Sequence, residues 1–101
     1  MSALENEFTQ ELIRKTEQAA KVCDYNPARF LQMVEKNGGV RTAKSYISRN
    51  QTSEGFEKLQ MCGKLNLSME AVVVDKKYAE LFTDDEVNSC FVLLCEYGFY
   101  K

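Results

Sequence analysis

Apolar residues recur at intervals of three and four along most of the chain, and this spacing places them on one face of an α-helix. The first such segment covers residues 1–24, where Ser2 and Glu5 form a capping box at its start. Its apolar positions are Leu4, Phe8, Leu12, Ala19, Val22 and Cys23. The pattern predicts a long N-terminal helix of about 20 residues.

Two more helices are predicted on either side of a glycine pair. Asn26 followed by Pro27 is typical of a helix start, because asparagine caps free N–H groups and proline fits the first helical position. This second helix should end at Gly38 and Gly39, where a left-handed conformation costs glycine least. The third helix should then stop near Asn50. Their apolar stripes are Phe30, Leu31, Met33 and Val34, followed by Val40, Ala43, Tyr46 and Ile47.

The middle of the chain predicts shorter pieces of helix. Ser53 is a candidate cap for a fourth helix that carries Phe56 and Leu59 and ends at Gly63. Residues 64–67 alternate between polar and apolar side chains, so we expect a few residues of extended backbone there.

The run Val72-Val73-Val74 has the strongest β propensity in the chain. No second strand of comparable length is available to pair with it, so it is predicted to be a buried helix or the end of one. Ser68 provides a cap before this run, and Asp75 caps a further turn after it.

A final helix is predicted to start at a second capping box, formed by Thr83 and Glu86, and to finish in a Schellman ending at Gly98 and Phe99. Apolar residues occupy more than one face of this helix, which makes it either central to the core or partly an interface. We favour the central position. The apolar positions are Val87, Cys90, Phe91, Val92, Leu93, Leu94, Cys95 and Tyr97.

Taken together, these elements predict an all-α fold, a compact bundle of five or six short helices with a long N-terminal helix and a largely apolar C-terminal helix. A chain of 101 residues is long enough to form one domain, residues 1–101, with a self-sufficient core. No apolar run reaches the roughly 18 residues that a membrane span requires. The first ten residues are acidic where a signal peptide would be basic, so we expect a cytoplasmic protein that does not contact the membrane.

Charge is distributed unevenly around a net value of −2. Residues 26–64 carry seven basic and three acidic side chains, whereas residues 65–101 carry three basic and seven acidic ones. A basic middle segment is compatible with nucleic acid, although the bias is weaker than nucleic-acid-binding domains usually show.

Metal chemistry has little support in the composition. The chain has no histidine, and its four cysteines form no CxxC motif, which excludes the common zinc frameworks and leaves only a site made of all four cysteines. We therefore expect no metal and no cofactor, and we interpret the cysteines as free, mostly buried side chains in a reducing compartment. The sequence leaves open whether Cys90 and Cys95 ever oxidise.

Residues 38–45, GGVRTAKS, resemble a phosphate-binding loop in which Ala43 replaces the second glycine. Such a loop needs a buried strand to deliver it to a helix, and here a helix is predicted to precede it. A helix-turn-helix corner within residues 30–49 is the alternative, with Arg41, Lys44 and Arg49 on an exposed face. In the interpretation that we favour, these charges are only the solvated side of a helix, and the glycines let two helices approach.

Catalysis is not predicted. Without histidine, a general base would have to be a carboxylate, and the dense cluster Asp84-Asp85-Glu86 is already explained as the first turn of a helix. No cysteine has a histidine base, and no GxSxG motif occurs. We therefore expect a protein that is not an enzyme.

The segments YNPARFLQMVEKNGGVRTAKSYI and SEGFEKLQMCGKLNLSMEAVVVDKKYAELFTDDEV, with the ending YGFY, resemble an uncharacterised bacterial all-helical domain. Its pattern is Tyr-x-Pro-x-x-Phe, Gly-Gly-Val-x-x-Ala-Lys, Gly-Phe-x-x-Leu, Leu-x-Leu-x-x-Glu-Ala and Leu-Phe-Thr, and it covers residues 25–99. The matching positions are Phe30, Gly38, Gly39, Ala43, Lys44, Gly55, Phe56, Leu59, Leu65, Leu67, Glu70, Ala71, Leu81, Phe82 and Gly98. Gln60 and Met61 depart from the aromatic and acidic pair of the pattern. The resemblance implies a helical fold and no particular activity.

The favoured functional hypothesis is a non-catalytic protein-interaction module, an accessory or phage-related protein that binds and modulates a larger bacterial protein or nucleoprotein complex. Its predicted contact surface combines exposed apolar side chains with the acidic end of the chain. These residues are Phe99, Tyr100, Asp84 and Asp85. In a variant of this hypothesis, the acidic surface imitates nucleic acid and inhibits a nuclease.

Nucleic-acid binding through Arg41, Lys44 and Arg49 is the second functional hypothesis, and it predicts an affinity that falls steeply with salt. The sequence does not favour a small-molecule ligand. It leaves the identity of the partner and homo-oligomer formation open.

Overall fold

Helices are the only regular elements in the part of the chain that the computed structural model describes, residues 3–53 and 55–99. The α-helices are α1 (Ala3–Cys23), α2 (Ala28–Asn37), α3 (Gly39–Ser48), α4 (Phe56–Met61), α5 (Met69–Val73) and α6 (Asp84–Glu96). Two 3-10 helices, η1 (Leu65–Leu67) and η2 (Lys76–Leu81), flank α5. The predicted all-α fold with a long N-terminal helix is confirmed.

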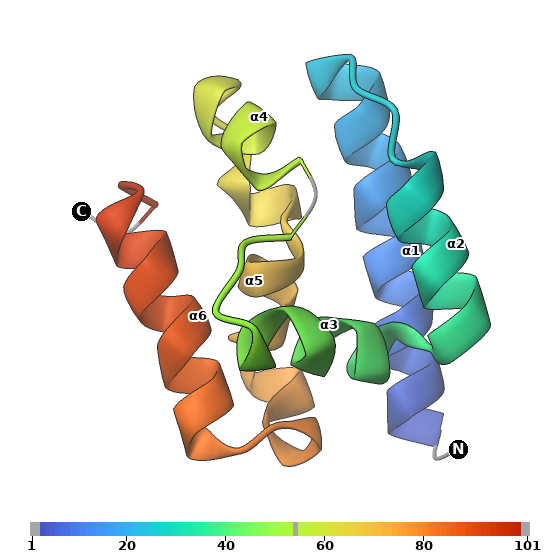
Figure 1. Ribbon diagram of the computed structural model, residues 1–101, viewed down its shortest axis with the longest axis vertical. Helices are drawn as coiled ribbons and strands as arrows, with labels where there is room; N and C mark the ends of the chain where they lie inside the picture. Colours follow the sequence, from blue (N-terminus) through green and yellow to red (C-terminus); the bar gives the residue numbers. More distant parts are fainter. Residues whose placement is uncertain (1–2, 54, 100–101) are drawn as a thin grey trace.

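The helices form a small bundle around the short helix α5. Figure 1 shows α1 and α2 side by side along one edge of the molecule, α6 along the opposite edge, and α5 between them. Helix α3 runs across the bundle from the end of α2 toward α6, and it packs against α1, α2, α5 and α6. The radius of gyration, 12.4 Å, is close to the value of about 13 Å for a compact chain of this length.

Helix α1 contributes one buried stripe to both parts of the core. Its buried residues, spaced by three and four, are Phe8, Leu12, Thr16, Ala19 and Cys23. Phe8 and Leu12 belong to a first apolar cluster with Phe30, Val34, Tyr78 and Phe82. Ala19 and Cys23 belong to a second cluster with Phe56, Leu59, Leu65, Leu67 and Leu94. The predicted periodicity of this helix therefore corresponds to its packing.

Most of the predicted caps are present. The side chains of Ser68, Asp75 and Thr83 each accept a backbone hydrogen bond at the start of a helix, at 3.0 to 3.2 Å. Asn26 Oδ1 accepts from the Ala28 N–H at 3.0 Å, but α2 begins at Ala28, so Pro27 is its N-cap and not, as predicted, its first helical residue. The capping box of α6 is complete, because Glu86 Oε1 also accepts from the Thr83 N–H at 2.8 Å. At the other end of α6, the Phe99 N–H donates to the Leu94 carbonyl at 2.9 Å, as a Schellman ending requires. Ser2, the proposed cap of α1, lies outside the described residues.

Two local predictions in the middle of the chain are wrong. Residues 64–67 are not extended, because Leu65–Leu67 form the 3-10 helix η1, which turns both leucines into the core. Ser53 does not cap α4, which begins after Gly55 at a φ of 84° without any side-chain cap. The Ser53 side chain bonds to Glu70 instead, a partner 17 residues away in sequence.

The expected central position of α6 is also wrong. Its buried residues are Cys90 and Leu94, while the Phe91 and Val92 side chains are each 44% exposed. The run Val72-Val73-Val74 explains the difference, because α5 occupies the centre with Val72 and Val73 almost completely buried. As Figure 1 shows, α6 covers only one side of α5.

The glycine corner between α2 and α3 is a tight bend pressed against α1. Gly38 has φ 85° and ψ 155°, a conformation open essentially to glycine alone and different from the predicted left-handed helical one. Gly39 is the first residue of α3, and a Cβ there would lie 3.0 Å from the Phe8 ring and from the Thr9 Cα. The Gly39 N–H donates to Thr9 Oγ1 at 2.9 Å. The favoured interpretation of this motif, a bend that lets helices approach, is confirmed.

None of the helices in the described segments is both long and apolar enough to cross a membrane.

We predict that Gly39→Ala lowers the free energy of unfolding by about 1–3 kcal/mol, because the added methyl group meets the backbone of α1 at Thr9 and the buried ring of Phe8. Urea denaturation followed by circular dichroism measures this loss. Ser48→Ala, on the exposed end of the same helix, is the control and should stay within about 0.5 kcal/mol of the wild type. A Gly39→Ala variant as stable as that control would contradict close packing at the corner.

Candidate functional site

The outward side of α6 combines exposed apolar side chains with exposed carboxylates. We call it the α6 face and define it as Asp84, Asp85, Val87, Asn88, Phe91 and Val92. Four of these side chains line a shallow surface hollow of about 400 Å³ together with Val74 and Ala79; they are Asp84, Val87, Asn88 and Phe91. The capping box at Thr83 fixes the start of the helix, and the 3.6-residue period then places residues 84, 88 and 91 on one side. The fold therefore presents an apolar hollow with an acidic end.

The first turn of α6 is strongly acidic. Asp84 and Asp85 are exposed, and the free N–H groups at a helix start favour negative charge there. Glu86 differs from them, because its Oε1 lies 2.7 Å from Lys44 Nζ. Burial acts to raise the pKa of Glu86, but hydrogen bonds from Lys44 and Thr83 outweigh it and hold the pKa below its usual range. Asp84 and Asp85 are consequently the exposed carboxylates of this first turn.

The basic residues predicted to face nucleic acid differ in their contacts within the protein. Lys44 pairs with Glu86 and lies over the Phe82 ring, 5.4 Å from its centroid. Arg49 Nε donates to the carbonyl of Ser45 in its own helix at 3.2 Å, and Arg41 is exposed. Nucleic-acid binding through these residues stays a prediction, and a failure to retard DNA or RNA in a gel at low salt would remove it.

The C-terminal part of the predicted contact surface is less exposed than expected. Phe99 is half-buried and packs against the second apolar cluster, because the Schellman ending folds it back over the last turn of α6. Tyr100 lies outside the described residues. Of the four residues predicted to contact a partner, Asp84 and Asp85 are therefore the ones that the structure places fully at the surface.

A buried carboxylate is the feature that the sequence analysis did not single out. Glu70, 1% exposed, accepts hydrogen bonds from the Ser53 N–H at 2.8 Å and from Ser53 Oγ at 2.7 Å. The two bonds tie the segment after α3 to the centre of the molecule. The sequence did contain an indication of this burial. Glu70 lies between Met69 and the valine run, and the buried residues of α5 include it together with these apolar neighbours. In the sequence analysis, Glu70 was only one of the positions that match the pattern of the bacterial helical domain.

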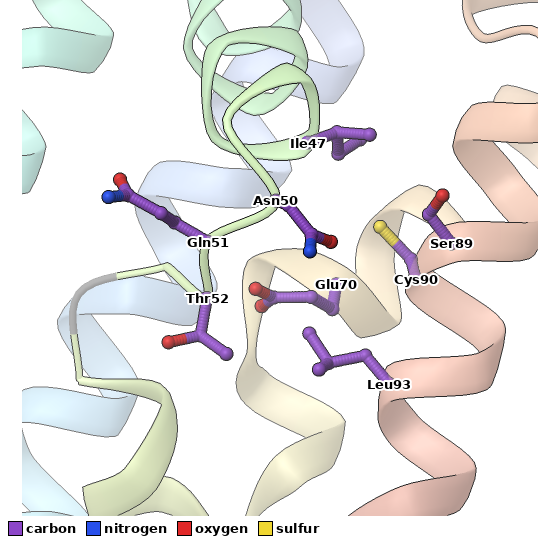
Figure 2. A pocket seen from close by; sticks show the side chains of 8 residues that line it. All are labelled: Ile47, Asn50, Gln51, Thr52, Glu70, Ser89, Cys90 and Leu93. Carbon is purple, nitrogen blue, oxygen red and sulfur yellow. The ribbon is translucent and has the colours of Figure 1, made fainter.

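Glu70 lies beside a small cavity between α5, α6 and the segment after α3. In Figure 2 its carboxylate points from α5 toward Thr52, while Ser89, Cys90 and Leu93 project from α6. The cavity has a volume of about 60 Å³, enough for a few water molecules. The residues that line it are Ile47, Asn50, Gln51, Thr52, Glu70, Ser89, Cys90 and Leu93.

The surroundings of the cavity favour the uncharged forms of its two titratable side chains, Glu70 and Cys90. Burial raises the pKa of Glu70, and the hydrogen bonds from Ser53 oppose that rise. Burial, followed by the nearby charges of Glu70 and Glu86, raises the pKa of Cys90 to about 12. Cys90 therefore stays a thiol at neutral pH, and a thiol is a poor nucleophile.

No group of three or more Cys, Asp or Glu side chains that could hold a metal ion is found in residues 3–53 and 55–99. The cysteines are free, but only Cys23 and Cys90 are buried, whereas Cys62 and Cys95 are exposed. The expectation that the cysteines are mostly buried is thus met for two of the four.

The chain was compared with protein families, with curated proteins and with solved structures. No protein-family model matches it, and no match is found among the curated proteins or among the solved structures. The resemblance to a bacterial helical domain, with its implied accessory or phage-related role, consequently stays a prediction from the sequence.

We predict that Glu70→Ala lowers the free energy of unfolding by about 1–3 kcal/mol, because the Ser53 N–H and hydroxyl lose their acceptors. Glu70→Gln keeps an acceptor and a donor of the same size. Since the pKa of Glu70 is raised in the folded chain, its contribution to stability is complete below the ordinary value of 4.5 and is lost as pH rises through the raised pKa.

Glu70→Gln removes this loss, so its stability relative to the wild type should increase from acid to neutral pH. Urea titrations at a series of pH values measure the difference. Glu80→Gln, on the exposed side of η2, is the matched control and should show no such trend. A constant difference between Glu70→Gln and the wild type at every pH would contradict the raised pKa.

Proposed function

We propose that the protein is a non-catalytic protein-interaction module, and that the α6 face binds an amphipathic helix of a partner protein with basic residues beside its apolar stripe. The observation that carries the proposal is the exposure of Phe91 and Val92, 44% each, directly after an acidic helix start.

The apolar half of this surface supports association. Phe91 adjoins a hollow whose other apolar walls are Val74, Ala79 and Val87. Burying apolar surface contributes about 25 cal/mol per Å², so an aromatic anchor seated against such a hollow is typical of the centre of a binding site. Exposed apolar side chains that are grouped over a hollow favour a binding surface more than scattered ones do.

The acidic half selects the kind of partner. Helix α6 contains four carboxylates, at positions 84, 85, 86 and 96, and no lysine or arginine. Lys44 neutralises Glu86, which leaves Asp84 exposed at the edge of the hollow and Asp85 exposed next to it in the same turn. Complementary charge raises association rates and selects against acidic partners. A partner with lysine or arginine next to its apolar residues fits this arrangement.

The dimensions suit a helix as the bound element. The 13 residues of α6 rise over roughly 20 Å, which corresponds to about three to four turns of a partner helix laid alongside. A helix in such a groove presents apolar residues at intervals of three and four to one side, as many peptide complexes do. In its finer form, an accessory or phage-related modulator of a larger bacterial complex, the proposal is supported by the sequence resemblance alone.

The test is affinity capture from a bacterial lysate with the wild type and with the double variant Phe91→Ser, Val92→Ser. Each captured protein is then purified, and its affinity is measured at low and high salt. We expect the double variant to lose at least about tenfold in affinity, since truncating a central aromatic side chain typically costs more than 1 kcal/mol. Asp84→Asn with Asp85→Asn should weaken binding mainly at low salt.

Val22→Ser provides the matched control, because Val22 is 49% exposed on α1 and lies outside the α6 face. A partner that binds the α6 variant as tightly as the wild type would remove this surface from consideration. If Phe99→Ala with Tyr100→Ala alone loses the partner, the contact lies at the end of the chain instead. Light scattering of the purified protein shows whether the occupant is a second copy of the same chain.

A further inference from the structure

The buried carboxylate of Glu70 has acceptor capacity beyond the hydrogen bonds that Ser53 donates to it. The Ser53 hydroxyl donates to Oε1 at 2.7 Å, and the Ser53 N–H donates to Oε2 at 2.8 Å. Because an ionised carboxylate has about four acceptor sites, capacity remains for further donors. In Figure 2 the carboxylate points away from α5 toward Asn50 and Thr52, two of the residues that line the cavity. A ligand that donates hydrogen bonds therefore finds an acceptor there.

No positively charged side chain of the described residues compensates the charge of Glu70. Neither lysine nor arginine lines the cavity, and the influences on the pKa of Glu70 are burial and hydrogen bonds. Arg49 adjoins Asn50 in sequence, but its guanidinium lies over the Tyr46 ring, 5.5 Å from the centroid, and its Nε donates to the Ser45 carbonyl. An ionised carboxylate that is buried without a cation is costly. A cation from solution would stabilise the ionised form of Glu70.

The cavity adjoins a wider hollow of about 450 Å³ at the surface. Both are lined by Asn50, Thr52, Ser89 and Leu93. The wider hollow is also lined by Asn88, Val92, Glu96 and Tyr97, so it combines a second carboxylate with apolar and aromatic surface and has no basic side chain in its lining. An elongated molecule with a positively charged end and a short apolar chain fits this pair of spaces.

We propose that the cavity is a binding site for a small primary amine, whose ammonium group lies beside Glu70 and whose alkyl chain lies in the wider hollow. An ammonium group is similar in size to a water molecule, so the cavity volume of about 60 Å³ accommodates it. It donates three hydrogen bonds, and the Thr52 and Ser89 hydroxyl groups are acceptors in addition to the carboxylate. Leu93 and Val92 give apolar contact to the chain.

Other ions fit this site less well. Ca²⁺ takes roughly six to eight oxygen ligands, often from several carboxylates. Residues 3–53 and 55–99 contain no group of three or more Cys, Asp or Glu side chains that could hold a metal ion. An anion would be repelled by Glu70 and Glu96. A monovalent cation that donates directed hydrogen bonds matches the single buried carboxylate and its hydroxyl and amide neighbours.

The inference goes beyond the proposed docking role and does not depend on it. Asn88 and Val92 belong to both the wider hollow and the α6 face, whereas Glu70 and Thr52 lie outside that face. Amine binding is measured without a partner protein. Its failure would therefore leave the docking proposal standing, and the loss of docking would leave the amine site standing.

The test is an NMR titration of the isotope-labelled full-length protein with n-butylammonium chloride at slightly alkaline pH, where the amine remains protonated. Sodium chloride and n-butanol at equal concentrations reproduce the ionic strength and the alkyl chain separately. We expect saturable shifts of backbone amide signals around the cavity, with a dissociation constant in the millimolar range for so small a ligand. Neither sodium chloride nor n-butanol should give saturable shifts there.

Two variants test the site from different sides. Glu70→Gln keeps the size of the side chain but removes the charge, so the affinity for n-butylammonium should fall at least about tenfold. Ser89→Leu places a larger side chain at the mouth of the cavity and should cause a similar loss. Because Ser89 is exposed, this second variant keeps the core residues and tests the site even if Glu70→Gln fails to fold. Glu80→Gln, which removes an exposed carboxylate elsewhere, is the control and should bind as the wild type does.

Several results would overturn the proposal. These are a wild-type protein without saturable shifts at the cavity, equal shifts with sodium chloride or n-butanol, an undiminished affinity in a folded Glu70→Gln or Ser89→Leu variant, and saturable shifts that centre on Asp84 and Asp85 instead.

Discussion

The buried stripe of α1 is the contact on which the rest of this fold depends. One helix of 21 residues supplies Phe8 and Leu12 to the first apolar cluster and Ala19 and Cys23 to the second. Phe8 meets the rings of Tyr78 and Phe82 edge-on at 5.1 and 5.2 Å between centroids, so sequence segments about 70 residues apart are joined through it. Helices as short as α4 and α5 are marginal alone, and α1 gives them a surface to pack on.

Much of this architecture could be predicted because it is encoded locally. The spacing of apolar residues and the caps at Ser68, Asp75 and Thr83 depend on neighbours within four positions, and each forms as expected. The predictions that were wrong concern contacts with residues that are distant in the sequence. Ser53 had a suitable helix to cap, but a buried carboxylate competes for its hydroxyl and its N–H. The five-residue helix α5 occupies the centre in place of α6. The local pattern of apolar residues does not show which of two apolar helices is more deeply buried.

The candidate site was predictable to a similar extent. Asp84 and Asp85 could be placed at an exposed helix start, since the capping box fixes the geometry there. The hollow beside Phe91 could not be predicted, because Val74 and Ala79 reach it from other elements only after the chain has folded. Lys44 was assigned to a basic face for the same reason: its partner Glu86 is 42 positions away. A single sequence does not show which distant positions are in contact.

Glu86 Oε1 accepts two hydrogen bonds, from the Thr83 N–H at 2.8 Å and from Lys44 Nζ at 2.7 Å. One oxygen atom thereby fastens the first turn of α6 to the middle of α3, whose own first residue presses on α1. The same carboxylate that completes the capping box of α6 is therefore also the partner of the α3 lysine. Through this one atom, the acidic start of α6 is coupled to the helix that crosses the whole bundle.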